Sequence, residues 1–226
     1  MVNPTKDASR KVDLVRGQKG LLITVGVAVI LFFILVIFVK AGTAANLNRE
    51  IYHSISPLIH SGLTSVMKAV SFLAEWYVWL VLAAVLCVFA KTRGNFGWTT
   101  GFATLAGGAV ATIAKDLFQI ARPHILWLTQ ETGYGFPSGH ATISAAFVAT
   151  FLYFLWRSKV KKGWKIFATV LGILWLLTIG FSRIYLGVHN PTDVLGGYFA
   201  GVAVAAATIF LKTIFQVVVR PKSSRK

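Results

Sequence analysis

Three short segments of this chain carry residue types that suit the handling of a phosphate group. They are Lys115-x6-Arg122-Pro123, Pro137-Ser138-Gly139-His140 and Ser182-Arg183-x5-His189-x3-Asp193. Together they hold three cations for an anion, two imidazoles for a nucleophile and a proton donor, and one carboxylate. This inventory predicts phosphoryl transfer that side chains carry out without a metal ion.

The third segment predicts a nucleophile. Asn190 and Pro191 are typical of a helix start, so His189 would project from the mouth of that helix. Asp193 lies four residues on and can reach back to the imidazole, holding the proton on Nδ1 and leaving Nε2 free to attack phosphorus. A helix cap beside a surface histidine would use the same residues, and that simpler reading stays open.

The second segment predicts an anion site at another helix start. Pro137 and a capping Ser138 introduce an apolar helix, whose free N–H groups and positive dipole end attract an anion. Gly139 would let the backbone come close to that anion. An ordinary helix start would explain the same residues without a ligand.

The cations of the set match the charge of a phosphate monoester. Lys115, Arg122 and Arg183 would bind its nonbridging oxygens. Their three positive charges and the negative charge of Asp193 leave two positive charges, which match the charge of about −1.5 to −2 on the ester. A zinc site is the rival use of His140, His189 and Asp193. Three nearby cations would oppose a dication and no thiolate helps, so we expect neither a metal nor a cofactor.

The rest of the chain predicts a membrane protein. Of its 226 residues 56% are hydrophobic and 13% charged, and the mean hydropathy is +0.69, too apolar for a soluble domain of this size. Apolar runs of about the length needed to cross ~30 Å of hydrocarbon indicate an all-α bundle of six transmembrane helices. The expected spans are residues 21–39, 66–90, 98–115, 138–156, 165–181 and 192–215.

Three boundaries follow from this pattern. Residues 1–20 and 220–226 are expected to be basic cytoplasmic tails, and residues 21–219 to form a single phosphatase domain. The run at residues 21–39 follows basic residues as a signal peptide would, but it is longer than the 7–15 apolar residues typical of one. We therefore expect a retained anchor. Residues 44–65 are expected to form short helices at the membrane interface rather than another crossing.

The distribution of basic residues predicts the orientation. Six spans place both termini on one side, together with most of the 23 lysines and arginines. The opposite side receives Lys40, Arg49, Lys68, Lys115, Arg122 and Arg183. The positive-inside rule then puts both termini in the cytoplasm and all three segments on the other face. Anionic headgroups explain the +16 net charge, so we expect a lipid bilayer and no nucleic acid as partner.

The three segments together resemble the complete signature of the type-2 phosphatidic acid phosphatase superfamily. Its members include lipid phosphate phosphatases and bacterial phosphatidylglycerophosphate and undecaprenyl pyrophosphate phosphatases. The resemblance implies that His189 forms a phosphohistidine, that Asp193 orients it, and that His140 protonates the leaving alkoxide and later activates water. It also implies that phosphate is bound by Lys115, Arg122, Ser138, Gly139 and Arg183.

The resemblance therefore predicts an integral membrane hydrolase for a lipid phosphate or pyrophosphate, in a bacterial cytoplasmic membrane with its site on the extracytoplasmic face. Phosphatidic acid, phosphatidylglycerophosphate and undecaprenyl pyrophosphate all stay open as substrates, as does the oligomeric state. Two alternatives remain. A phosphotransferase of the same superfamily would pass the phosphoryl group to another lipid, and a phosphate-anion transporter could also place charges at helix ends.

Overall fold

The computed structural model describes residues 18–88 and 96–219, and within these ranges the chain is all-helical, as predicted. The expected tails lie outside the described residues except for residues 18–20. The helices are α2 (Lys19–Lys40), α3 (Ala45–Ile55), the 3-10 turn η1 (Ser56–Leu58), α4 (Ser61–Leu73), α5 (Trp76–Val88), α7 (Trp98–Phe118), α8 (Gly139–Arg157), α9 (Lys162–Tyr185) and α10 (Pro191–Val219).

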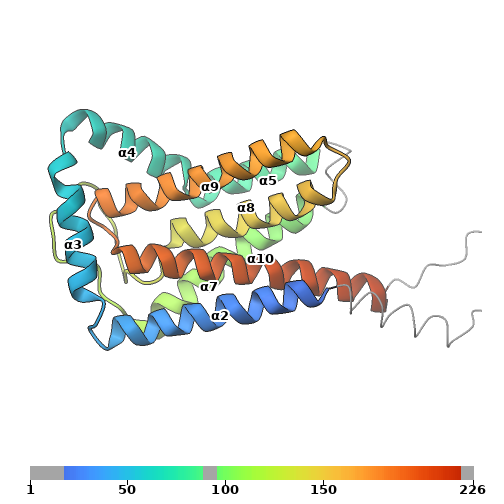
Figure 1. The fold of residues 1–226 in the computed structure, drawn as a ribbon, viewed down its shortest axis with the longest axis horizontal. Coiled ribbons are helices and arrows are strands. Elements are labelled where there is room, and N and C mark those ends of the chain that lie inside the picture. Colours follow the sequence, from blue (N-terminus) through green and yellow to red (C-terminus); the bar gives the residue numbers. More distant parts are fainter. Residues whose placement is uncertain (1–17, 89–95, 220–226) are drawn as a thin grey trace, which may run out of the picture.

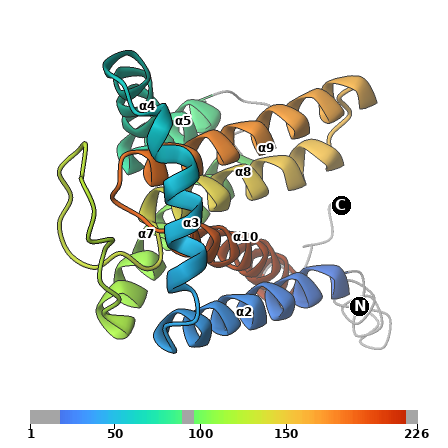
Figure 2. The ribbon, with the colours of Figure 1, turned by 60° about the vertical axis from the view of Figure 1, so that its left-hand side comes forward.

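The long helices lie side by side as a bundle, with α8 and α10 at its centre (Figure 1). α10 packs against α8 and α2, α7 against α8 and α10, and α9 against α8 and α4. The short α3 crosses the end of the bundle instead of joining it (Figure 2). The segment expected to form short helices is thus α3, η1 and the start of α4.

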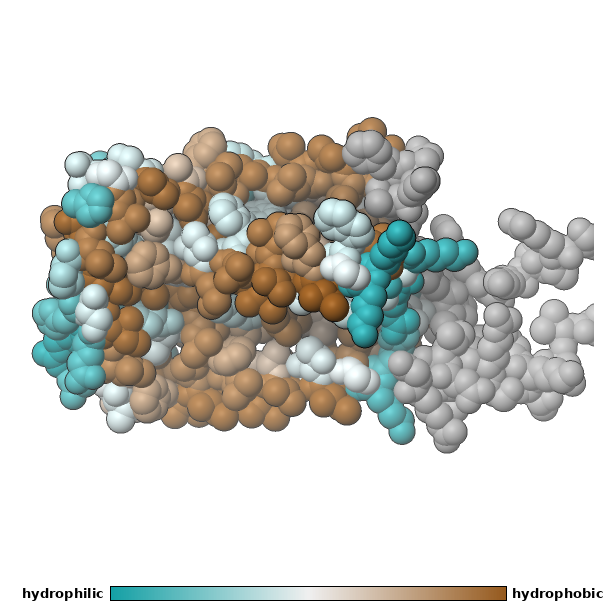
Figure 3. Space-filling view, turned by 45° about the horizontal axis from the view of Figure 1, so that its top comes forward, coloured by the Kyte–Doolittle hydropathy of each residue, from teal (hydrophilic) through white to brown (hydrophobic). Residues whose placement is uncertain are grey.

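A broad apolar surface covers the middle of the bundle on the face that Figure 3 shows, and hydrophilic side chains gather toward its two ends. Large apolar side chains face outward on successive turns, for example Ile23, Ile30 and Ile37 on α2 and Leu171 and Leu174 on α9. A water-soluble monomer rarely exposes so large a continuous apolar surface. The surface therefore fits a lipid environment.

Among the residues that the structure describes, four helices are long and apolar enough to cross a membrane: α2, α8, α9 and α10. A fifth crossing arises if α4 and α5, which bend by 51° at a short break, form one span. The span expected at residues 66–90 thus corresponds to a bent pair of helices as far as Val88, and residues 89–90 lie outside the described residues. The helix breaks at Ala74 and Glu75, where the Ala74 carbonyl accepts a hydrogen bond from the Trp79 indole at 3.2 Å, outside the usual helical ladder.

The expected third span, residues 98–115, corresponds to α7, and its composition does not qualify it as a crossing. Its threonines and glycines lower its hydropathy, because its inner face consists of small residues such as Thr100, Ala103 and Gly107 that pack against neighbouring helices. Its outer face carries large exposed apolar side chains, including Phe102 and Ile113. Six spans are thus not established by helix length and composition.

The starts of α8 and α10 lie in close contact, and two glycines make this possible. A Cβ atom on Gly197 would lie 2.7 Å from the Ser138 carbonyl oxygen, and one on Gly201 would lie 2.7 Å from the Ala145 Cβ. Two glycines four residues apart allow such close helix packing in a membrane protein. The Ser138 N–H also donates to the Asp193 carbonyl at 2.9 Å. This packing fixes the first turns of both helices against each other.

Candidate active site

All three predicted segments meet at the end of the bundle next to α3 (Figure 1). Lys115 and Arg183 come from the last turns of α7 and α9, and His140 and Asp193 from the first turns of α8 and α10. The loop after α7 joins them, because Arg122 donates through Nη1 to the Val188 carbonyl at 3.0 Å. Residues far apart in sequence thus form one cluster.

His189 and Asp193 are both buried, with 2% and 0% of their side chains exposed. His189 Nδ1 lies 3.6 Å from Asp193 Oδ2, slightly longer than a hydrogen bond. The same carboxylate oxygen accepts from the Asn190 N–H at 2.8 Å. Asp193 therefore caps the start of α10, as an acid at the third helical position does, while it also faces the imidazole.

The other ring nitrogen of His189 faces a cation. Arg122 Nη1 lies 3.3 Å from His189 Nε2, and a guanidinium can only donate, so Nε2 must be the unprotonated nitrogen. Burial lowers the pKa of His189 well below its usual value, and the charges of Arg183, Arg122 and Lys115 lower it further. His189 is therefore neutral at physiological pH, with its lone pair on Nε2.

Arg122 is fully committed to protein acceptors. A guanidinium has five N–H donors, and its contacts are the carbonyls of Gly133, Val188 and Thr132, His189 Nε2, and Glu131 Oε2 at 3.2 Å. Lys115 donates to the carbonyl of Tyr134 in the same loop. The loop of residues 119–138 is thus held by two of the cations predicted to bind phosphate.

Glu131 is a site residue that the sequence analysis missed. Its Oε1 accepts from Arg183 Nη2 and its Oε2 from Arg122 Nη2, so one carboxylate bridges both arginines. The side chain of Arg183 is 2% exposed and that of Glu131 is 23% exposed. Arg183 Nη1 also donates to Ser71, on α4. A single acidic residue in a loop rich in site residues was the available signal for Glu131.

Glu75 is the second residue that was missed. It lies at the break between α4 and α5, and its Oε1 is 3.3 Å from His140 Nε2. In the sequence Glu75 is one of the few charged residues within the apolar run at residues 66–90. A lone carboxylate inside an apolar run usually has a polar partner and a function, which was the signal to follow.

Ser138 behaves differently from the prediction. It occupies the N-cap position of α8, but its hydroxyl makes no capping hydrogen bond, and that expectation is wrong. Its carbonyl accepts from both the backbone and the side chain of Thr142, at 3.0 and 2.9 Å, whereas its buried hydroxyl has no hydrogen-bond partner. A Cβ atom on Gly139 would meet no atom within 4 Å, so the backbone there faces open space.

Unpaired polar atoms are concentrated in this cluster. Among the residues that the structure describes, the buried side-chain atoms without a hydrogen-bond partner are Ser138 Oγ, His140 Nε2, Ser144 Oγ, Arg183 Nε, His189 Nδ1 and Asp193 Oδ1. All but Ser144 belong to the predicted site, and the two imidazole nitrogens lie near carboxylate oxygens, at 3.3 Å from Glu75 and 3.6 Å from Asp193, without making a hydrogen bond. Because buried polar groups are nearly always paired, this concentration is typical of a place where a polar ligand binds.

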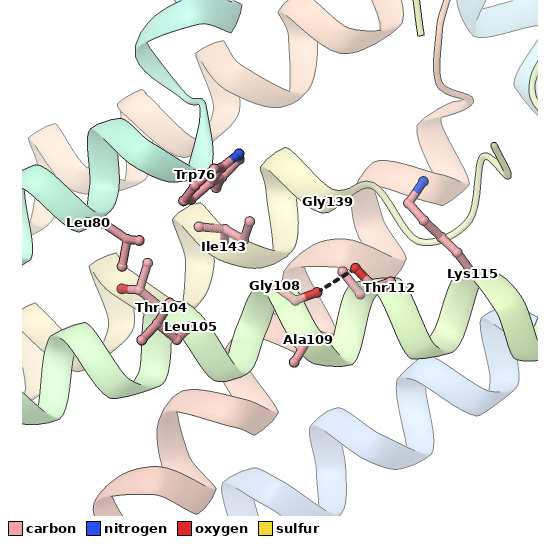
Figure 4. A pocket seen from close by; sticks show the side chains of 11 residues that line it. Trp76, Leu80, Thr104, Leu105, Gly108, Ala109, Thr112, Lys115, Gly139 and Ile143 are labelled. Carbon is pink, nitrogen blue, oxygen red and sulfur yellow. Dashed lines mark hydrogen bonds between the residues drawn. The ribbon is translucent and has the colours of Figure 1, made fainter. Parts of the chain in front are cut away.

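An apolar cavity of about 310 Å³ leads away from the cluster (Figure 4). It lies between α5, α7 and α8, and is lined by Trp76, Leu80, Thr104, Leu105, Gly108, Ala109, Ala111, Thr112, Lys115, Gly139 and Ile143. Lys115 and Gly139, at one end, belong to the predicted anion site. A polar group at that end and a hydrocarbon tail along the rest would match this lining.

A second cavity, of about 680 Å³, is lined by the end of α2, by α3 and by the loop after α7. Asn48, Arg49 and Tyr52 of α3 contribute to its wall, and it reaches Arg122 and Asn190. Within residues 18–88 and 96–219, no three His, Cys, Asp or Glu side chains are grouped as a metal ion would require.

An all-helical bundle with an apolar surface, whose cations, imidazoles and carboxylates meet at one end, has the features of a membrane-embedded phosphate hydrolase. Comparison with known proteins agrees. A family model described as PAP2 superfamily matches residues 96–216. The undecaprenyl-diphosphatase of Sulfolobus acidocaldarius is 29% identical over 184 residues, which cover 77% of this chain and 84% of that protein.

A sequence and a solved structure from Bacillus subtilis extend the comparison. Phosphatidylglycerophosphatase B is 33% identical over 148 residues, covering 63% of this chain and 68% of that protein. The crystal structure of a transmembrane PAP2 type phosphatidylglycerolphosphate phosphatase has the same fold, with a TM-score of 0.75 and 23% identity over 82% of this chain and 94% of that chain. This chain belongs to the PAP2 superfamily. It is a phosphate hydrolase of the lipid phosphatase family.

Proposed function

We propose that this protein hydrolyses a phosphate or diphosphate ester of a membrane lipid, without a metal ion, through a covalent phosphohistidine at His189. The observation that carries the proposal is the concentration of unpaired buried polar atoms on Ser138, Arg183 and His189 at the end of an apolar cavity. One end of that space suits a phosphate, and the other suits a hydrocarbon chain.

In the first step, Lys115, Arg122, Arg183 and the start of α8 at Ser138 and Gly139 bind the phosphate oxygens. His189 Nε2 attacks phosphorus and the bond from phosphorus to the ester oxygen breaks. His140 donates its proton to that oxygen, so the leaving group departs as a neutral alcohol, or as a lipid monophosphate if the substrate is a diphosphate.

In the second step, His140 takes a proton from a water molecule, whose oxygen attacks phosphorus and breaks the bond to His189. Free phosphate leaves and both imidazoles return to their initial states. Asp193 orients His189, and Glu75, 3.3 Å from His140 Nε2, acts as a positioning residue for His140. Water would arrive through the cavity at α3, whose wall includes the polar side chains of Asn48, Arg49 and Asn190.

The same proposal includes the six-span topology, with residues 21–219 as one phosphatase domain, both tails in the cytoplasm and the site on the extracytoplasmic face. The apolar outer face of α7 supports its placement in lipid. In a Cys87→Ser background, a cysteine at the exposed His124 should react with a membrane-impermeant reagent in intact cells, and one at the exposed Lys161 should not. Labelling of position 161 alone would reverse the orientation.

Turnover of purified protein in detergent tests the activity itself. Phosphatidic acid, phosphatidylglycerophosphate and undecaprenyl diphosphate should each be assayed for release of free phosphate with EDTA present and no lipid acceptor. We expect at least one to be hydrolysed and chelation to leave the rate unchanged. Phosphate transfer that requires an added alcohol would favour the phosphotransferase, and activity lost to EDTA and restored by zinc would contradict the metal-free mechanism.

A further inference from the structure

The loop of residues 119–138 places one short segment against every cation assigned to phosphate. Lys115 donates to the Tyr134 carbonyl, Arg122 to the carbonyls of Thr132 and Gly133, and Arg183 to the carboxylate of Glu131. We call residues 131–134 the plug segment. Its acceptors thus occupy donors on all three cations that a phosphate group would use, although Arg183 Nε remains unpaired.

The Glu131 carboxylate resembles a phosphate in how it is held. Its two oxygens are shared between the Nη2 atoms of Arg122 and Arg183, and arginine forks bind carboxylate and phosphate oxygens in the same way. Because the contacts of Arg122 use all five of its donors, it cannot bind a ligand oxygen unless a present contact is released.

Charge also prevents Glu131 and a phosphate from occupying the site together. The cations Lys115, Arg122 and Arg183 are already offset by the carboxylates of Asp193, Glu131 and Glu75, which lie in the same cluster. A phosphate dianion beside all three carboxylates would leave an excess of negative charge in a buried site, which is unfavourable. Glu131 is the one that can leave easily, because it belongs to a loop and keeps 23% of its side chain exposed.

We propose that Glu131 is an internal competitor that phosphate must displace from Arg122 and Arg183, so that the plug segment occludes the anion site until a phosphate group of sufficient charge enters. The proposal rests on the proposed function, since it needs both arginines to bind phosphate. Displacement weakens binding of every anion, so the free phosphate product is released more readily and weakly charged anions such as carboxylates are rejected.

Competitive inhibition by vanadate and by inorganic phosphate tests the proposal, because the proposal predicts whether the inhibition constant rises or falls when Glu131 loses its charge. Glu131→Gln should lower the inhibition constant of both by about tenfold, roughly the contribution of one charge-assisted hydrogen bond. Glu131→Asp, which keeps the charge, should remain near wild type. Asp116→Asn is the matched control, because it removes an exposed charge next to Lys115 without touching the plug segment, and it should change inhibition by less than about twofold.

The opposite result would overturn the proposal. If Glu131 only holds the arginines in position, Glu131→Gln should raise the inhibition constants or leave them unchanged. Arg183→Ala distinguishes a failure of this proposal from a failure of the proposed function. Weaker inhibition of Arg183→Ala together with unchanged inhibition of Glu131→Gln would contradict only the role of the plug segment. Unchanged inhibition of Arg183→Ala would contradict the assignment of Arg183 to the phosphate site.

A second measurement keeps Glu131 in place and does not depend on how its variants fold. In a Cys87→Ser background, a cysteine at the exposed Gln130 reports on the plug segment next to it. Saturating inorganic phosphate should increase its rate of reaction with a maleimide several-fold, because the segment has been displaced. The same or a slower rate with phosphate bound would mean that the segment stays in place, and would contradict the proposal.

Discussion

Replacing His189 with alanine should abolish turnover of lipid phosphates, with kcat lower by at least about 10⁴-fold, since the bond-forming atom is lost. Vanadate should still bind, because Lys115, Arg183 and the start of α8 do not depend on the imidazole. Rapid acid-free quenching of the wild-type protein with ³²P-labelled substrate should trap an acid-labile, base-stable phosphoryl group. His189→Ala should trap none.

The pH dependence of kcat/KM tests the role of His189 as the nucleophile without a variant. Burial, followed by the charges of Arg183, Arg122 and Lys115, lowers the pKa of His189, so the nucleophile stays neutral on both sides of the ordinary imidazole pKa of about 6.5. The acidic limb of kcat/KM should therefore lie below that pH. A limb at or above it, or appreciable turnover by His189→Ala, would show that another group attacks phosphorus.

The convergence of the three motifs could be predicted because each was tied to the end of an apolar run. If Lys115 ends one helix, His140 begins the next and Asp193 begins another, antiparallel helices of similar length must bring them to one end of the bundle. The glycines at positions 197 and 201 favour close packing of the last helix, but only the structure shows that its partner is α8. Motif position and membrane thickness were together sufficient for the general location of the site.

The contacts that depend on loops and breaks could not be predicted in this way. Glu131 lies in a loop without periodicity, and only folding of that loop over Arg122 and Arg183 brings its carboxylate to them. Glu75 became a partner of His140 because the helix breaks beside it. The α7 span was ambiguous because residues chosen for close packing against α8, such as Gly107, are the ones that lower hydropathy.

His140→Ala should separate the two chemical steps through the leaving group. With a lipid phosphate, kcat/KM should fall by about 10²–10⁴-fold, the usual contribution of a general acid and base. With p-nitrophenyl phosphate the leaving phenolate needs little protonation, so formation of the phosphohistidine should be much less affected while its hydrolysis, which needs a base, stays slow. Stopped-flow absorbance should then show a burst of nitrophenolate equal to the enzyme concentration.

Glu75→Gln should have a smaller effect than His140→Ala, because it keeps the side-chain shape and removes only the charge 3.3 Å from His140 Nε2. It should reduce lipid turnover by roughly tenfold and leave the rate of the nitrophenolate burst near that of wild type. If His140→Ala slows the burst as much as it slows lipid turnover, then His140 acts on phosphate binding rather than on the leaving group. In that case another residue of the cluster must be the proton donor. The contact with Glu75 would then only stabilise the break between α4 and α5.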